Sequence, residues 1–191
     1  MISSTQLRKA VLVAALIATP ALQAAEVAGV KVDDKLRIGN NELVLNGAGL
    51  RSKLFIKVYV GALYVSQKTT TSAAIVDSTQ PRRMVMRLMR DLDAETLHSA
   101  LEEGLKNNHT PAEMAAMKPQ ADKLASIMKA IGKAREGDTI ALDFLGDEVA
   151  VSVNSEARGK VVGAGFPKAL LKVWLGEQPA DGALKKALLG S

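Results

Sequence analysis

The spacing of apolar residues changes its period along this chain, and the order of those changes constrains the fold more than any other feature. Residues 54–65 and 82–90 send successive side chains to opposite faces, which indicates strands. Residues 97–131 repeat apolar positions every three or four residues, which indicates helices. Residues 138–153 return to strands and residues 166–190 to helices. Parallel α/β folds alternate the two element types, so this order predicts an α+β fold with an antiparallel sheet carrying helices on one face.

The first 24 residues have the pattern of a secretory signal peptide. Arg8 and Lys9 precede a short apolar run, and small residues lead up to Ala24. The run is too short to span a bilayer, so a retained membrane helix is the less favoured alternative. We expect cleavage after Ala24, an exported periplasmic protein without a membrane span, and a single domain over residues 25–191.

Most catalytic signatures are absent from the sequence. The chain has no cysteine and two histidines, His98 and His109, which leaves no thiolate nucleophile and no histidine-rich metal site. No phosphate-binding, zinc-protease or nucleophile-elbow motif is present. Dispersed arginines and six aromatic residues do not suit nucleic-acid binding, although the net charge is +5. We therefore expect no cofactor, no metal and no nucleic-acid partner.

Arg51 and Tyr59 are the first candidates for a binding site. On a continuous strand they share a face, because they lie eight residues apart. A guanidinium in an apolar cleft needs an anionic partner, which a ligand carboxylate or phenolate can supply. The alternatives are a structural ion pair with Glu42 or Asp143, or exposure at the strand end. Lys57 has the same parity and is either a ligand contact or a lysine at the sheet rim.

Trp174 belongs to the almost wholly apolar helical stretch that follows Phe166 and Pro167. Its two interpretations are core packing and the wall of an apolar pocket, and Val173 beside it has the same two. A sequence of this kind does not separate an aliphatic pocket lining from an aliphatic core.

Five stretches resemble the chalcone isomerase superfamily, most closely its exported bacterial chalcone isomerase-like branch. They are LNGAGLR at 45–51, FIKVYVGALYV at 55–65, MRDLDAE at 89–95, GFPKALLKVWLG at 165–176 and LKKALLG at 184–190. The resemblance covers the chain beyond residue 24 in the right order. It implies an open-faced β-sandwich, in which a large antiparallel sheet is backed by a layer of helices with a ligand cleft between them.

The resemblance also bears on function. In the plant enzymes of the superfamily, an arginine matched here by Arg51 and a threonine at the position of Tyr59 assist flavanone ring closure. The catalytic tyrosine of a later helix has no counterpart, because the only tyrosines are Tyr59 and Tyr64. At the substrate-contacting pair of the late helix this chain carries Val173 and Trp174. A fatty-acid-binding plastid branch instead pairs the arginine with a tyrosine that holds a carboxylate.

The resulting expectation is a periplasmic protein that binds a fatty-acid-like or other amphipathic carboxylate. Arg51, Tyr59 and Lys57 would contact the head group, and Trp174 and Val173 would enclose the tail. One alternative is an isomerase or intramolecular lyase acting on an enone, with Arg51 and Tyr59 as its catalytic residues. Another is a structural or interaction protein whose cleft is filled by its own side chains. The oligomeric state and protein partners stay open.

Overall fold

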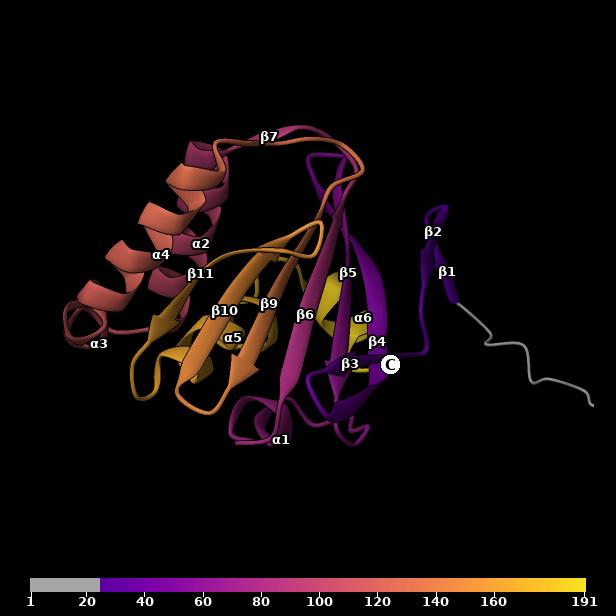
Figure 1. Cartoon of the computed structure of the whole chain (residues 1–191), viewed down its shortest axis with the longest axis horizontal. Coiled ribbons are helices and arrows are strands. Elements are labelled where there is room, and N and C mark those ends of the chain that lie inside the picture. The colour runs from indigo at the N-terminus through magenta and orange to yellow at the C-terminus, as the bar shows by residue number, and fades with distance from the viewer. Residues whose placement is uncertain (1–24) are drawn as a thin grey trace, which may run out of the picture.

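A computed structural model describes residues 25–191 and shows a curved seven-stranded antiparallel sheet (Figure 1). The predicted signal peptide, residues 1–24, lies outside the described residues. The strand order across the sheet is β11-β10-β9-β6-β5-β4-β3. The strands are β3 (Lys35–Ile38), β4 (Asn41–Lys53), β5 (Ile56–Val65), β6 (Arg82–Leu88), β9 (Thr139–Leu145), β10 (Glu148–Val153) and β11 (Glu156–Val162). Every neighbouring pair is antiparallel.

Two short strand pairs lie outside this sheet. One is the hairpin of β1 (Ala25–Val27) and β2 (Val30–Val32), and the other joins β7 (Leu92–Asp93) to β8 (Lys133–Ala134). The β1–β2 hairpin stands beside the β3–β4 edge of the sheet in Figure 1.

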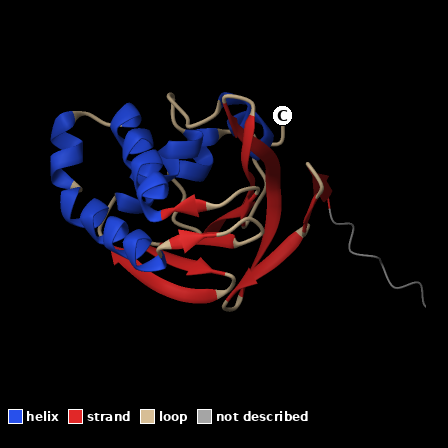
Figure 2. Cartoon of the chain, turned by 90° about the horizontal axis from the view of Figure 1, so that it is seen from above, coloured by secondary structure: helices blue, strands red, loops and turns tan. Residues whose placement is uncertain are grey.

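The helices gather on one side of the curved sheet (Figure 2). They are α1 (Ser72–Val76), α2 (Ala94–Asn108), α3 (Pro111–Ala116), α4 (Lys118–Ile131), α5 (Phe166–Leu175) and α6 (Gly182–Leu188). Three of them, α2, α3 and α6, start at a residue whose side chain caps the helix; Asp93 accepts from the Thr96 amide at 2.7 Å, and Thr110 forms a capping box with Glu113. No helix in this part of the chain is long and apolar enough to cross a membrane.

Both faces of the sheet bury apolar side chains, but unequally. The larger cluster lies between sheet and helices, where α5 is buried along most of its length. The smaller cluster lies on the other face and includes Val32, Leu43, Val60 and Tyr64. Because β5 is central and contributes to both clusters, all its residues from Val58 to Val65 are buried. The predicted α+β fold, with a large antiparallel sheet backed by helices, is confirmed.

The chain between Arg51 and Tyr59 is not a continuous strand. Strand β4 ends at Lys53, Leu54 and Phe55 form a two-residue turn, and β5 starts at Ile56. The prediction of one strand over residues 54–65 was wrong at its start because this turn contains no Gly, Asn, Asp or Pro to signal it. Arg51 and Tyr59 share a face because they are paired across two strands, not because they are eight residues apart on one.

Candidate functional site

A small cavity lies between the sheet and the helix layer and brings together four of the five predicted ligand contacts. Arg51 and Tyr59 come from paired positions of β4 and β5, and Val173 and Trp174 come from α5. The cavity measures about 60 Å³, the share of roughly two water molecules in liquid water. Apart from the hydroxyl of Thr96, the rest of its lining is apolar: Val58, Met86, Leu88, Leu92, Leu97, Ala100, Leu101, Met128, Ile140, Leu142 and Ala180.

The Tyr59 hydroxyl is buried at this cavity. It accepts a hydrogen bond from Trp174 Nε1 at 2.7 Å, and only 5% of the residue is exposed. Desolvation raises the pKa of Tyr59, while Arg51 and the Trp174 hydrogen bond oppose the rise. The phenol therefore keeps its proton at neutral pH. Among the described residues, nothing accepts a hydrogen bond from that proton.

Arg51 lies against the same tyrosine. Its guanidinium carbon is 5.5 Å from the centre of the Tyr59 ring, a cation–π arrangement. Its Nε is buried and has no hydrogen-bond partner, and no carboxylate of the described chain forms an ion pair with Arg51. A buried donor without an acceptor is destabilising, so the site has unused capacity to bind an anion.

The candidate carboxylate partners of Arg51 are engaged elsewhere. Glu42 pairs with Lys35 at 2.9 Å, and Asp143 pairs with Arg83. Asp181, which lies near Tyr59, accepts the Ala183 and Leu184 amides at the start of α6. The structural ion pair with Glu42 or Asp143, which the sequence left open, is therefore absent.

Lys57 does not join this group. It is exposed, pairs in register with Ser52 near the end of the hairpin, and does not line the cavity. Its position matches the alternative interpretation of a lysine at the sheet rim.

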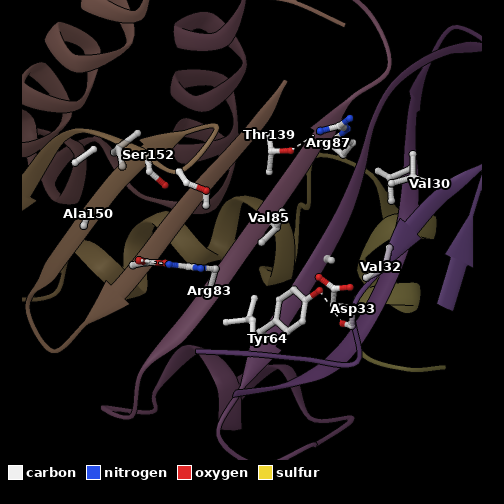
Figure 3. Close-up of a pocket in the computed structure, with 18 of the residues that line it drawn as sticks. Val30, Val32, Asp33, Tyr64, Arg83, Val85, Arg87, Thr139, Ala150 and Ser152 are labelled. Atoms are coloured by element: carbon white, nitrogen blue, oxygen red, sulfur yellow. Dashed lines mark hydrogen bonds and ion pairs between the residues drawn. The ribbon is translucent and has the colours of Figure 1, made fainter. Parts of the chain in front are cut away.

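A second concavity, which sequence reasoning missed, lies on the opposite face of the sheet (Figure 3). This outer groove measures about 990 Å³, and the β1–β2 hairpin forms one of its walls. Its floor is made of small apolar side chains that alternate along the strands with the inner core. They are Val60, Ala62, Val85, Ala141 and Ala150. No sequence motif marks it, because its wall forms only when the hairpin folds beside the sheet.

The half-buried and buried ionisable side chains of the outer groove are already paired. Arg83 forms two hydrogen bonds with Asp143, and the Tyr64 hydroxyl donates to the Asp33 carbonyl at 2.9 Å (Figure 3). Arg87 donates to the Thr139 hydroxyl at 3.0 Å. Burial and the nearby Asp33 and Asp34 carboxylates raise the pKa of Tyr64 to about 12. The groove is larger than the inner cavity but offers a ligand no unsatisfied buried charge.

No group of three or more His, Asp or Glu side chains among residues 25–191 is placed to hold a metal ion.

Comparisons with known proteins agree with this architecture. The structure is similar to that of a fatty-acid binding protein of Arabidopsis thaliana, with a TM-score of 0.69 at 17% sequence identity, covering 84% of this chain and 92% of that one. No curated protein sequence matches the chain. A family model described as chalcone isomerase-like matches residues 24–190. Because that match spans nearly the whole length, the chain belongs to the chalcone isomerase-like family.

Proposed function

We propose that this protein binds an amphipathic carboxylate of the fatty-acid type between its sheet and its helices, without transforming it. One observation carries the proposal: the buried Nε of Arg51 has no partner beside the Tyr59 hydroxyl, at the edge of an otherwise apolar cavity. The family membership and the fatty-acid binding protein of similar fold support it.

The donors at this site suit a carboxylate. A guanidinium offers two parallel N–H groups to the two oxygens of a carboxylate, and such charge-assisted bonds are among the strongest in proteins. Tyr59 adds a neutral O–H donor, because its raised pKa keeps the proton in place. Apolar side chains around these donors suit an acyl chain better than a polar substrate.

The cavity must widen to hold such a ligand. Its volume of about 60 Å³ is far below the 300 Å³ or more that is typical of ligand pockets. The first half of α2 is the least buried part of the cavity wall. Leu97 and Leu101 line the cavity there, but no residue of α2 before Gly104 is buried. Met86 and Met128 also line the space and have flexible side chains that adapt to a ligand. We infer that the acyl chain enters as this half of α2 moves away from the sheet.

Trp174 provides a direct test, because it is the only tryptophan and lies in the cavity wall. Dodecanoate should change its fluorescence saturably, and dodecanol serves as the uncharged control. Arg51→Met should weaken dodecanoate binding about tenfold or more while affecting dodecanol little, since a hydrogen bond to a charged group contributes about 1.5–3 kcal/mol. Arg87→Met is the matched control in the outer groove and should bind dodecanoate as the wild type does.

Extraction of ligand from the purified protein complements the titration. Native mass spectrometry should detect a bound carboxylate in the wild type and a much smaller amount in Arg51→Met. Equal dodecanoate affinity in the wild type and Arg51→Met would contradict the proposal. Altered binding in Arg87→Met alone would move the site to the outer groove.

The small cavity volume also favours a second candidate, a structural protein whose cleft is filled by its own side chains. The Trp174–Tyr59 hydrogen bond links α5 to β5 across the lining of the cavity, which suits such a role. An empty purified protein whose fluorescence responds neither to dodecanoate nor to dodecanol would support this candidate.

We also propose that the protein acts in the periplasm after cleavage behind Ala24, on the strength of the signal-peptide pattern in residues 1–24. The intact mass of the protein recovered from a periplasmic fraction tests this, since a chain starting at Met1 would contradict it.

A further inference from the structure

The turn between β4 and β5 contains residue types that its backbone conformation does not favour. Lys53 pairs with Ile56, and both turn residues have positive φ, 50° for Leu54 and 66° for Phe55. Two-residue turns of this kind favour Asn and Gly, because bulky side chains strain a left-handed backbone. The other two-residue hairpin turns of residues 25–191 follow that preference, each with a Gly or Asn: Ala28–Gly29, Gly39–Asn40, Gly146–Asp147 and Asn154–Ser155.

The apolar side chains at this turn do not pack into the core of the protein. Phe55 is 103% exposed, Leu54 84% and Ile56 51%, the most exposed large apolar cluster of the described chain. The backbone is strained and the side chains remain in water. Neither the turn conformation nor the exposed side chains of Leu54 and Phe55 stabilise the fold. These side chains therefore suit a contact with another molecule.

Two lysines flank the same turn. Lys53 and Lys57 are both exposed, and neither forms an ion pair within the described residues. The nearest acidic group bonded to this segment, Asp181, accepts the Ser52 amide at 3.3 Å and also caps α6. We call residues 53–57 the hairpin tip. It lies where β4 passes into β5, at the upper end of the sheet in Figure 1.

We propose that the hairpin tip docks on an anionic phospholipid bilayer, with Leu54 and Phe55 entering the headgroup region and the two lysines binding lipid phosphates. Aromatic and aliphatic side chains partition into the interface, and each nearby lysine gains from the negative surface potential. A specific protein partner is less suited to this surface, because protein interfaces bury about 1,200 Å² or more and this tip offers only three apolar side chains.

Docking at the tip also orients the inner cavity. Arg51 lies two residues before the tip and Tyr59 two residues after it. The polar end of the cavity would then face the headgroup layer, which is where an amphipathic carboxylate enters or leaves a bilayer. This consequence rests on the proposed function, whereas docking itself does not.

Vesicle flotation tests docking without any added carboxylate. We compare vesicles of phosphatidylglycerol and phosphatidylcholine with vesicles of phosphatidylcholine alone, using protein whose N-terminus has been defined by its intact mass. The wild type should bind the anionic vesicles and lose this binding at high salt. A wild type that binds neither kind of vesicle at low salt would overturn the proposal.

The sharpest variant combines Leu54→Asn with Phe55→Gly. These residues suit the backbone of the turn, so the melting temperature should stay the same or rise while partition into anionic vesicles falls about tenfold or more. Phe55→Ser alone should lower partition in the same direction. Val162→Asn, which removes another exposed apolar side chain on β11, should leave partition unchanged. Equal partition in the tip variants and the wild type would overturn the proposal.

Charge reversal tests the lysines separately. Lys53→Glu with Lys57→Glu should lower partition about fivefold or more and abolish the preference for phosphatidylglycerol. Lys123→Glu with Lys129→Glu on α4 makes the same change in net charge at exposed, unpaired positions and should change partition less than about twofold. Equal losses in the two pairs would show that net charge, and not the tip, governs binding, which would also overturn the proposal.

Discussion

The two faces of the sheet differ in opposite directions: one has a small cavity with an unpartnered arginine nitrogen, and the other has a large groove whose buried polar groups are paired. The helix-covered face encloses about 60 Å³ beside an arginine whose Nε has no partner. The open face holds about 990 Å³, but its Arg83 is paired with Asp143 and its Tyr64 with a backbone carbonyl. Volume alone would select the outer groove as the binding site. The missing hydrogen-bond partner of Arg51 Nε indicates the inner cavity instead.

For this protein, an unpartnered polar group indicates the binding site better than the volume of a cavity does. To bind an ion at Arg83, the groove must break the half-buried Arg83–Asp143 pair, and the other cations that line it are exposed to water. A small apolar cavity needs only movement of its wall, because its arginine gains a partner that it lacks. Four predictions test this comparison of the two faces.

The largest effect is expected from neighbouring residues of β6 that face opposite sides. Met86→Ala removes a buried side chain from the inner cavity and should lower the free energy of unfolding by about 3 kcal/mol. Val85→Ala, in the half-buried floor of the outer groove, should cost less than about 1 kcal/mol. Urea unfolding followed by circular dichroism measures both, and equal losses would contradict the assignment of one face as core and the other as open groove.

Breaking the outer ion pair should have the next largest effect. Arg83→Met leaves the Asp143 carboxylate unpaired with its side chain only 15% exposed. We expect a loss of about 2 kcal/mol, less than for a fully buried pair because water still reaches both groups. Arg87→Met is the control, since that arginine is exposed and bonds only Thr139 through its side chain. Similar stabilities for the two variants would show that the Arg83 pair contributes no more than a surface contact.

The inner arginine should matter far less for stability. Arg51→Met removes the cation–π contact with Tyr59, which contributes about 1 kcal/mol or less, and also removes an unpartnered buried donor. The melting temperature should therefore change by only a few degrees, in contrast to Arg83→Met. A loss as large as that of Arg83→Met would mean that Arg51 has a structural partner, and would weaken the binding proposal.

The smallest effect is a shift in tyrosine ionisation, which reports each face separately because the chain has one tyrosine on each. Folding raises both pKa values above that of the unfolded chain, so the neutral phenols contribute stability that is complete below about pH 10. That stability is lost as the pH rises through the pKa values of the folded protein, of which that of Tyr64 is about 12. Near-ultraviolet titration of Tyr64→Phe isolates Tyr59.

Arg51→Met then tests whether the Arg51 charge lowers the pKa of Tyr59. Without the neighbouring guanidinium, the pKa of Tyr59 should rise further, while that of Tyr64 on the other face should not move. An unchanged Tyr59 titration would place the Arg51 charge too far from the hydroxyl to assist it in holding a carboxylate.

Much of the fold was predictable because local patterns and tertiary contacts agree. Helices α2 and α3 start at the capping residues Asp93 and Thr110, and the apolar stretch of α5 is buried along most of its length. The order of the elements sufficed for the α+β class and the antiparallel sheet. At the site, the sequence singled out Arg51, Tyr59, Val173 and Trp174, which meet at one cavity, whereas Lys57 lies outside it.

The arrangement of these residues depends on contacts between elements that are far apart in the chain. The Leu54–Phe55 turn has no local signal, so the cross-strand pairing of Arg51 with Tyr59 was hidden, although its consequence, a shared face, was anticipated. The volume of the cavity, and the fact that no carboxylate of residues 25–191 pairs with Arg51, depend on how separate elements pack. The sequence determines which faces are apolar through its period, but whether two apolar faces meet fully or leave a space depends on packing distances between residues far apart in the chain.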